Sequence, residues 1–310
     1  MNRHFLRDIA DIQTGPFGSQ LHKEDYVDIG TPIVTVEHLG NRVFTEQNLP
    51  KVSDEDKARL SKYVLKEGDI VFSRVGSVDR CSYVDAAHDG WMFSGRCLRV
   101  RPNTEVDPLY LYYFFCLEDT KQFVRNIAVG ATMPSINTKL LGEVEVAYPS
   151  QTEQQKIVAL LSALDDKIEI NQKINDNLYA QAKAIFAQRF IGIETIPDGW
   201  KKGNLLDIAN YLNGLAMQKF RPRDDEVGLP VLKIKELRQG SCDVSSELCS
   251  PSIKPEYIVH DGDVIFSWSG SLLVDIWCGG TCGLNQHLFK VTSETYDQWF
   301  YYLPSHAAYN

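Results

Sequence analysis

The feature that most restricts the fold of this chain is the segment from Gln151 to Phe190, which contains no glycine and no proline over forty residues. Both residues disrupt helices, so their absence predicts one continuous helix, about 58 Å long from Thr152 to Phe190 at 1.5 Å per residue. Thr152, followed three residues later by Gln155, resembles a capping box that starts a helix. A helix of this length is more typical of a strut than of a core element.

Apolar residues recur along this segment with the four- and three-residue spacing of a coiled coil, and two asparagines interrupt the seam. The pattern favours pairing with a second long helix in one register. The alternative is a long helix that lies only on its own domain. The predicted pairing positions are Ile157, Leu161, Leu164, Ile168, Asn171, Asn175, Leu178 and Ile185.

The sequence before this helix is repeated after it. The blocks DIADIQTG and GTPIVTVEHL, at residues 8–15 and 30–39, are matched after the helix by DIANYLNG and GLPVLKIKEL. Residues 63–78 (YVLKEGDIVFSRVGSV) and 257–272 (YIVHDGDVIFSWSGSL) are identical at seven of sixteen positions. Three blocks that keep their order indicate two copies of one domain.

The repeat and the helix together predict an α+β protein. Two homologous mixed α/β domains with twisted β-sheets, residues 1–149 and 196–310, are joined by a long coiled-coil-type helix within residues 150–195. The sequence stops at Asn310, about where the first copy reaches Gln122. The second copy is therefore expected to be incomplete, without a second long helix after it.

Composition is that of an ordinary globular protein, with 44% hydrophobic and 24% charged residues, so both copies can hold a core. The net charge of −9 argues against a protein that coats nucleic acid by charge alone. The seven cysteines are scattered without metal-ligand spacing, which predicts no metal site and a reducing, cytoplasmic location. No apolar run is long enough for a membrane span, and no signal peptide pattern is present.

No catalytic signature is present. The sequence contains no phosphate-binding loop, no GxSxG, no HExxH and no CxxC, and it lacks the Pro-Pro-aromatic signature of amino-methyltransferases. These absences argue against NTPase, serine hydrolase, zinc peptidase and methyltransferase activity in this chain, and binding chemistry remains.

Loops that differ between two copies of one scaffold are where binding specificity normally lies. We expect a strand over residues 93–100, matched by residues 283–290, and exposed loops near Arg74 and Trp268. Arginine side chains suit guanine, lysines suit phosphates, and an indole stacks or wedges in a groove. The alternatives are solvated surface charges and, for Trp268, core packing. The candidate DNA-contacting residues are Arg74, Arg80, Arg96, Arg99, Lys219, Arg221, Arg223, Lys233, Lys235, Arg238, Trp268 and His287.

These features resemble the specificity subunit of type I restriction–modification systems. The helix sequence from Thr152 to Glu169, followed by Asn171 and by Ile185-Phe186, is similar to the conserved region of that family. Residues 196–200 (IPDGW) look like the usual start of its target recognition domains. The resemblance covers nearly the whole chain.

The resemblance implies that each domain reads one short half of a split sequence in double-stranded DNA, while the helix fixes the unread spacer. It implies no catalysis and no cofactor in this chain. The partners it implies are methyltransferase subunits, which use S-adenosylmethionine, and restriction subunits, which use ATP and Mg²⁺. Two chains that pair through their long helices would form a homodimer, and no membrane is involved.

Two other functions stay open at this stage. One is a truncated decoy, or an inactive allele, that binds methyltransferase subunits without directing productive methylation. The other is an unrelated two-domain interaction protein with a dimerising helix.

Overall fold

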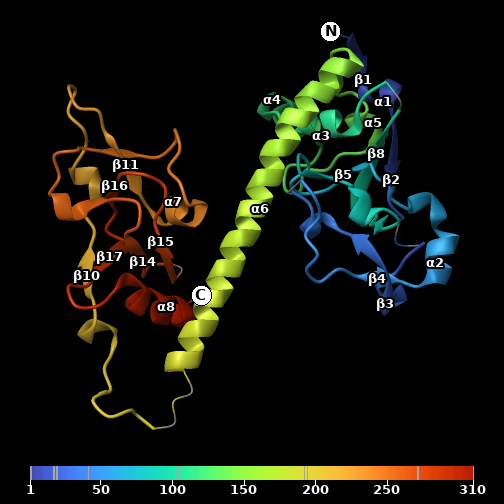
Figure 1. Ribbon diagram of the computed structural model, residues 1–310. Coiled ribbons are helices and arrows are strands. Elements are labelled where there is room, and N and C mark those ends of the chain that lie inside the picture. The colour runs from blue at the N-terminus through green and yellow to red at the C-terminus, as the bar shows by residue number, and fades with distance from the viewer. Residues whose placement is uncertain are drawn as a thin grey trace. The chain divides into compact units, whose positions relative to one another are not determined.

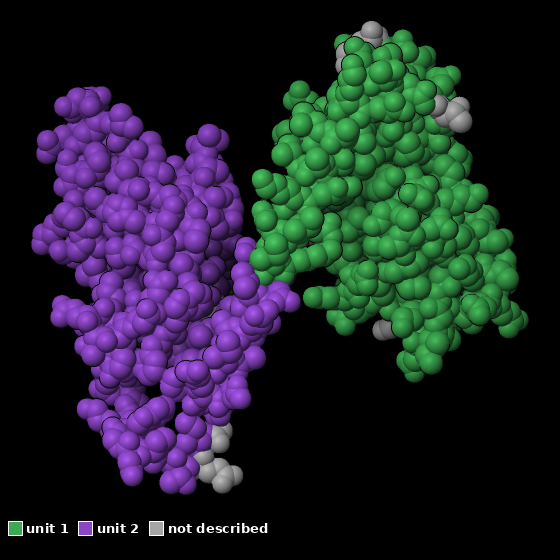
Figure 2. All heavy atoms as spheres, viewed as in Figure 1, with its two compact units in different colours: residues 1–174 green, residues 175–310 purple. Residues whose placement is uncertain are grey.

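The computed structural model of this chain describes residues 2–16, 18, 20–40, 42–103, 105–191, 193, 195–270 and 272–309. The chain divides into two compact units, residues 1–174 (unit 1) and 175–310 (unit 2), which Figure 2 shows in different colours. The dividing point lies inside the long helix, so each unit holds part of it. The boundaries expected from the sequence, at residues 149 and 196, stay a prediction.

Unit 1 contains two main sheets and a strand pair. The antiparallel sheet has the order β2 (Ala10–Thr14), β8 (Cys97–Pro102), β5 (Ile70–Ser73) and β6 (Cys81–Tyr83). The mixed sheet has the order β4 (Lys51–Val52), β3 (Tyr26–Val34) and β7 (Met92–Phe93), in which β3 and β7 are parallel. β1 (Asn2–Phe5) pairs with β9 (Glu145–Tyr148). The helices are α1 (Leu6–Ile9), α2 (Asp54–Arg59), α3 (Pro108–Cys116), α4 (Glu118–Ile127) and α5 (Thr138–Leu141).

Unit 2 repeats this topology, labelled in Figure 1. Its antiparallel sheet has the order β10 (Asn210–Asn213), β17 (Leu288–Thr292), β14 (Val264–Ser267) and β15 (Leu273–Ile276). Its second sheet has the order β12 (Leu248–Cys249), β11 (Leu229–Leu232), β16 (Cys282–Leu284) and β13 (Ile258–Val259), with β11 and β16 parallel. The helices are α7 (Ile234–Gln239) and α8 (Gln298–Tyr309). The predicted fold class, two homologous mixed domains with a long helix, is confirmed.

The Gly-Asp turn before the central strand is built in the same way in both units. Gly68 and Gly262 have φ of 90° and 92°, a left-handed conformation that favours glycine. The following carboxylate accepts a hydrogen bond from the backbone N–H three residues earlier, in Asp69 at 2.8 Å and in Asp263 at 2.8 Å. The repeated sequence motif is thus a turn that starts β5 and β14, not a binding site.

The long helix α6 (Gln151–Phe190) is continuous, as the sequence predicted. Its start differs from the expectation. The carbonyl of Ser150 accepts the N–H groups of Glu153 and Gln154 at 3.0 Å, and the Ser150 hydroxyl contacts the Glu153 carboxylate at 3.2 Å. The helix therefore begins one residue before Thr152, and Ser150 supplies the first acceptor, two residues after β9 ends at Tyr148.

The α6 helix packs on the equivalent helix in each unit. In unit 1, the Gln154 amide oxygen accepts the Asp107 N–H at 2.8 Å at the start of α3, and Val158 packs against the core. In unit 2, Tyr179 and Phe186 of α6 pack against the core cluster that includes α8. The remaining faces of α6 are exposed to solvent.

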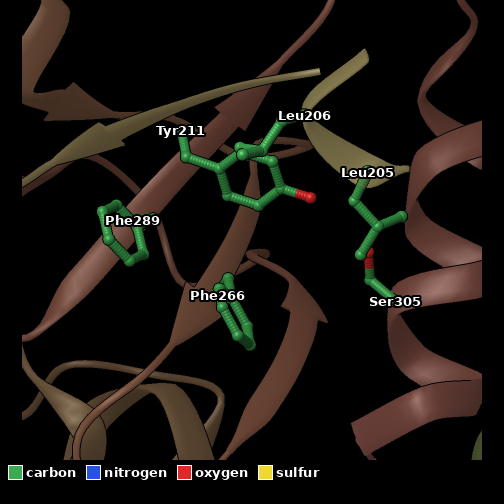
Figure 3. A pocket seen from close by; sticks show the side chains of 6 residues that line it. All are labelled: Leu205, Leu206, Tyr211, Phe266, Phe289 and Ser305. Carbon is green, nitrogen blue, oxygen red and sulfur yellow. The ribbon is translucent and has the colours of Figure 1, made fainter. Parts of the chain in front are cut away.

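The hydrophobic core is more complete in unit 1 than in unit 2. Phe72 of β5 is buried and meets Phe115 edge to face at 4.8 Å, and Ile136 covers the same cluster. Phe266 is the matching residue of β14. Figure 3 shows it with Tyr211 and Phe289 around a pocket of about 260 Å³. The three rings that line this pocket are half-buried, whereas Phe72 in unit 1 is buried.

Two predicted strands are shorter than expected, because a turn interrupts them. The expected strand over residues 93–100 is divided into β7 and β8, which belong to different sheets, and Ser94, Gly95 and Arg96 form the turn. Residues 283–290 are divided in the same way into β16 and β17. The local sequence does not show this break, since apolar residues such as Phe93 and Leu98 lie on both sides of it.

All seven cysteines are free thiols. Cys278 is exposed, whereas Cys81, Cys97, Cys249 and Cys282 are buried, and burial raises the pKa of the Cys97 thiol to about 12. We expect a thiol reagent at pH 8 to label Cys278 at least about tenfold faster than these four. Mass spectrometry of the labelled peptides measures this, and a Cys278→Ser variant should lose the fast phase. Fast labelling of the four buried thiols would contradict the core described above.

Candidate nucleic-acid interface

One end of the unit 1 sheets gathers loops that are distant in sequence. The turn at residues 94–96 is the centre: the Arg74 N–H donates to the Arg96 carbonyl at 2.8 Å and the Ser94 N–H to the Val34 carbonyl at 2.8 Å. The Gly15 N–H donates to the Cys97 carbonyl at 3.2 Å. We define loop cluster 1 as residues 15, 16, 18, 35–37, 74–76 and 94–96.

Unit 2 builds the same arrangement from equivalent loops. The Asn285 N–H donates to the Leu232 carbonyl at 3.2 Å, and the Gln286 N–H to the Leu215 carbonyl at 2.9 Å. The Gly214 N–H donates to the Leu288 carbonyl at 3.0 Å. We define loop cluster 2 as residues 214–216, 233–235, 268–270 and 285–287.

A glycine is required at the same place in both clusters. A Cβ atom on Gly15 would lie 2.1 Å from the Ser94 carbonyl oxygen, and one on Gly214 would lie 2.2 Å from the Asn285 carbonyl oxygen. Both distances are below any real contact, so only glycine lets the two loops approach. The scaffold of the two clusters is thus shared, whereas the side chains they present differ.

The structure brings six of the predicted residues into these clusters. In loop cluster 1, Arg96 is exposed and Arg74 is half-buried, with its Nη1 donating to the Gly95 carbonyl at 3.2 Å. In loop cluster 2, the Trp268 and His287 rings lie 5.9 Å apart, and the indole is 44% exposed. Core packing of Trp268 is therefore not what the structure shows. The other predicted site residues in loop cluster 2 are Lys233 and Lys235.

Arg99 is buried in the sheet and lies outside loop cluster 1. It is 3% exposed, its Nη2 pairs with the Asp11 carboxylate, and burial lowers the pKa of its guanidinium. The turn at residues 94–96 explains the difference from Arg96, because β8 begins after it and both faces of that strand are covered. Arg80 donates to the Leu39 carbonyl and supports the loop that follows η2 (Val36–His38). Arg80 is exposed outside loop cluster 1, and its role in DNA binding stays a prediction.

The basic residues of unit 2 are exposed but several already have acidic partners. Glu247 contacts Arg221 at 3.2 Å and Lys233 at 2.6 Å, and the hydrogen bond from Lys233 is the main reason why its pKa is lowered. Lys235 lies 3.4 Å from Asp243. Phosphates would have to compete with these carboxylates. The further predicted phosphate-contacting residues are exposed on the surface of unit 2: Lys219, Arg223 and Arg238.

One side chain of loop cluster 1, that of Glu37, is not among the site residues predicted from the sequence. Glu37 lies with Arg96 and Thr35 in the lining of a recess of about 510 Å³. The signal was present in the repeat, since the aligned position in the second copy is Lys235, a basic residue on the same scaffold.

The predicted pairing face of α6 is uncovered. Ile157, Leu164, Ile168, Leu178 and Ile185 are between 39% and 58% exposed. Leu160 and Ile174, at 65% and 50%, extend this apolar stripe. Asn171 and Asn175 are exposed within it, and Leu161 is half-buried at its edge.

Neither a metal centre nor a membrane span is seen in the described part of the chain. Its His, Cys, Asp and Glu residues form no group of three or more that is suited to a metal ion. No helix within it combines the length and the apolar character that crossing a bilayer requires.

The sequence profile of the family described as "Type I restriction modification DNA specificity domain" matches residues 2–180. The specificity subunit of the type I restriction enzyme MjaIX of Methanocaldococcus jannaschii is 26% identical over 288 residues, which cover 86% of this chain and 66% of that protein. The HindI specificity subunit of Haemophilus influenzae is 29% identical over 146 residues, 46% of this chain and 32% of that protein. The chain thus spans about two thirds of the first relative and matches one third of the second.

Among solved structures, the crystal structure of the type I restriction–modification S subunit from M. genitalium is similar in fold. The TM-score is 0.54 at 15% identity, and the match covers 98% of this chain and 76% of that chain. At this identity the likeness concerns the fold alone.

Proposed function

This chain belongs to the family of type I restriction–modification DNA specificity domains, and from that premise we propose that it directs DNA modification to a split sequence in double-stranded DNA. Each unit reads one part of the sequence through its loop cluster. The chain itself has no catalytic role. Its methyltransferase partners bring S-adenosylmethionine and methylate the DNA, while a restriction subunit, where one joins, uses ATP and Mg²⁺.

The main support for this proposal is that the two loop clusters share a backbone scaffold but present different side chains. Both clusters use the same glycine and two equivalent backbone hydrogen bonds, donated by Gly15 and Ser94 in the first and by Gly214 and Asn285 in the second. Yet Arg74 and Arg96 in the first correspond to Trp268 and His287 in the second. Guanidinium, imidazole and indole groups offer different contacts to base edges. Two related readers with different side chains suit a target whose halves differ.

Two features support the proposed partners: the net negative charge of the chain and the exposed apolar stripe of α6. The net charge of −9 leaves part of the phosphate binding to other subunits. The apolar stripe on α6 is the surface for a second long helix, and the polar faces of α6 are available to methyltransferase subunits. The free thiols suit a cytoplasmic setting.

The test is adenine-methylation mapping of DNA from cells that express this chain with a methyltransferase subunit from the same system. A split, asymmetric methylated motif is expected if both units read DNA. A symmetric motif built from one half-site would mean that two chains pair and only one unit reads. Copurification of the methyltransferase without any methylation would overturn the proposed function.

Arg74→Glu is expected to weaken recognition of the first half-site by about 10- to 100-fold and to leave the second half-site unchanged. The new carboxylate cannot donate to the guanine acceptors N7 and O6, and the turn at residues 94–96 loses the donor that holds Gly95. Methylation frequencies across half-site variants measure this. Arg3→Glu, an equal charge change at an exposed position on β1, is the control. Equal losses for all sequences would make Arg74 a phosphate contact.

A further inference from the structure

We infer that Glu37 and Arg96 together read one C·G base pair in the first half-site, with Arg96 donating to guanine and Glu37 accepting from cytosine. The inference rests on the proposed function and deepens it, because it names the base pair and the residues that select it. It also assigns a role to an acidic side chain that a phosphate-binding surface would not contain.

The two side chains face one recess without neutralising each other. Glu37 and Arg96 are exposed, and both line the recess of about 510 Å³ in loop cluster 1. Within the described residues, neither forms an ion pair at 4.0 Å or less. The charges of both are therefore available to a ligand that offers a donor and an acceptor side by side.

A C·G pair offers that combination in the major groove. Guanine presents the acceptors N7 and O6, which arginine bonds with two hydrogen bonds, and the neighbouring cytosine presents the N4 amino donor, which a carboxylate accepts. A carboxylate near the phosphate backbone is otherwise repelled. A hydrogen bond from the cytosine amino group would offset this repulsion and so explains an acidic residue at a DNA-binding surface.

The alternative is that Glu37 only stabilises its own loop. The Thr35 hydroxyl does donate to Glu37 Oε1 at 3.0 Å. The same hydroxyl also contacts the Nδ1 atom of His38 at 3.0 Å, and the His38 Nδ1 accepts the Thr35 N–H at 3.0 Å. The loop is thus held by His38 as well, and the contact from Thr35 orients one carboxylate oxygen while the other remains for a ligand.

The second unit supports a reading role for these positions. The residue aligned with Glu37 is Lys235, and the residue before β17 that matches Arg96 is His287. Glu37 lies in η2 and Lys235 in α7, and both turns are capped alike, because the Thr35 N–H donates to the His38 side chain at 3.0 Å and the Lys233 N–H to the Glu236 side chain at 3.3 Å. This shared cap does not require the reversal from an acid to a base. A change of the preferred base between the two half-sites does explain it.

The experiment is selection of bound sequences from a randomised double-stranded DNA pool by the full 310-residue chain together with its methyltransferase subunits, for wild type and Glu37→Gln. Wild type should enrich a first half-site with one fixed C·G pair. Glutamine donates as well as accepts and pairs well with adenine, so the variant should lose preference at that base pair by about 10-fold or more. All other positions of the motif should keep their preference, which also shows that the variant is folded.

Arg96→Gln and Glu67→Gln complete the design. Arg96→Gln should relax the same base pair as Glu37→Gln. Glu67 is exposed in the turn that precedes β5, outside loop cluster 1, so Glu67→Gln removes the same charge and should leave the motif unchanged.

An unchanged motif in Glu37→Gln, or effects of Glu37→Gln and Arg96→Gln at different base pairs, would overturn the inference while the proposed function stands. A uniform loss over all sequences would assign both residues to general affinity and would also overturn it. If wild type enriches no motif, the proposed reading of DNA by this chain fails, and the inference fails with it.

Discussion

Asp69→Ala is expected to destabilise unit 1 by about 3 kcal/mol, because it leaves a partly buried guanidinium without its partner. Asp69 is 1% exposed and accepts hydrogen bonds from Arg101 Nε at 2.6 Å and Arg101 Nη2 at 2.7 Å, besides the Lys66 N–H. These bonds raise the pKa of Arg101. Removing one member of a fully buried pair costs about 3–5 kcal/mol, and the partial exposure of Arg101 favours the lower end.

The second unit provides the matched comparison for this prediction. Asp263 meets Lys290 Nζ at 2.7 Å, and its side chain is 23% exposed, so Asp263→Ala should cost unit 2 about half as much. Hydrogen exchange resolved by peptide separates the two units. Asp69→Ala should lower protection in residues 1–174 only, and Asp263→Ala in residues 175–310 only. Equal losses in both units, or a change below about 0.5 kcal/mol, would contradict the assignment.

The elements that the sequence predicted well are those set by local or repeated signals. The helix from Gln151 to Phe190 needs no tertiary contact to be recognised, since nothing in it breaks a helix. The repeat predicted two equivalent units, and β2, β8, β5 and β6 correspond in order to β10, β17, β14 and β15. Similar residues at matched positions impose similar strands.

The positions of individual site residues were harder to predict, because they depend on where strands end. Arg96 and Arg99 are three residues apart, and a continuous strand would have carried both. A turn before Cys97 leaves Arg96 exposed, whereas Arg99 pairs in register with Val71 and Gln13 inside the sheet. The sequence of β8 alternates, with Leu98 and Val100 in the core cluster and Arg99 and Arg101 on the other face. The alternation predicts an exposed Arg99 and does not reveal that the second face is covered as well, where Arg99 is 3% exposed. Glu37 was not predicted for another reason, since its position beside Arg96 depends on a recess formed by three loops.

The second large expected effect is on self-association through the apolar stripe of α6. The stripe is symmetric about Asn171: Leu164 and Leu178 lie seven residues on either side of it, and Ile157 and Ile185 lie fourteen. An antiparallel pair of α6 helices centred on Asn171 therefore places leucine opposite leucine and isoleucine opposite isoleucine. An asparagine at the centre fixes the register of such a pair.

Leu164→Glu/Leu178→Glu is expected to weaken self-association by more than about 100-fold, because each end of the seam then brings two carboxylates together in an apolar contact. The chain should remain folded, with a change in the free energy of unfolding within about 0.5 kcal/mol, since both leucines are more than half exposed. Sedimentation equilibrium of the wild type and the variant measures this. Ala180→Glu/Ala184→Glu adds the same charge at exposed positions off the stripe and should leave association unchanged.

A second experiment tests the antiparallel register by asking whether variants of opposite charge pair with each other. A chain with Leu164→Lys/Leu178→Lys should also be monomeric alone, yet a mixture with Leu164→Glu/Leu178→Glu should form a heterodimer, because opposite charges then face each other at both ends. A parallel pair in register also places opposite charges together in the mixture. A single-site pair, Leu164→Glu with Leu178→Lys in the partner, distinguishes the two, since these positions meet only in the antiparallel arrangement. A wild-type chain that stays monomeric at all concentrations would leave the stripe to a helix of a different protein and would contradict the homodimer.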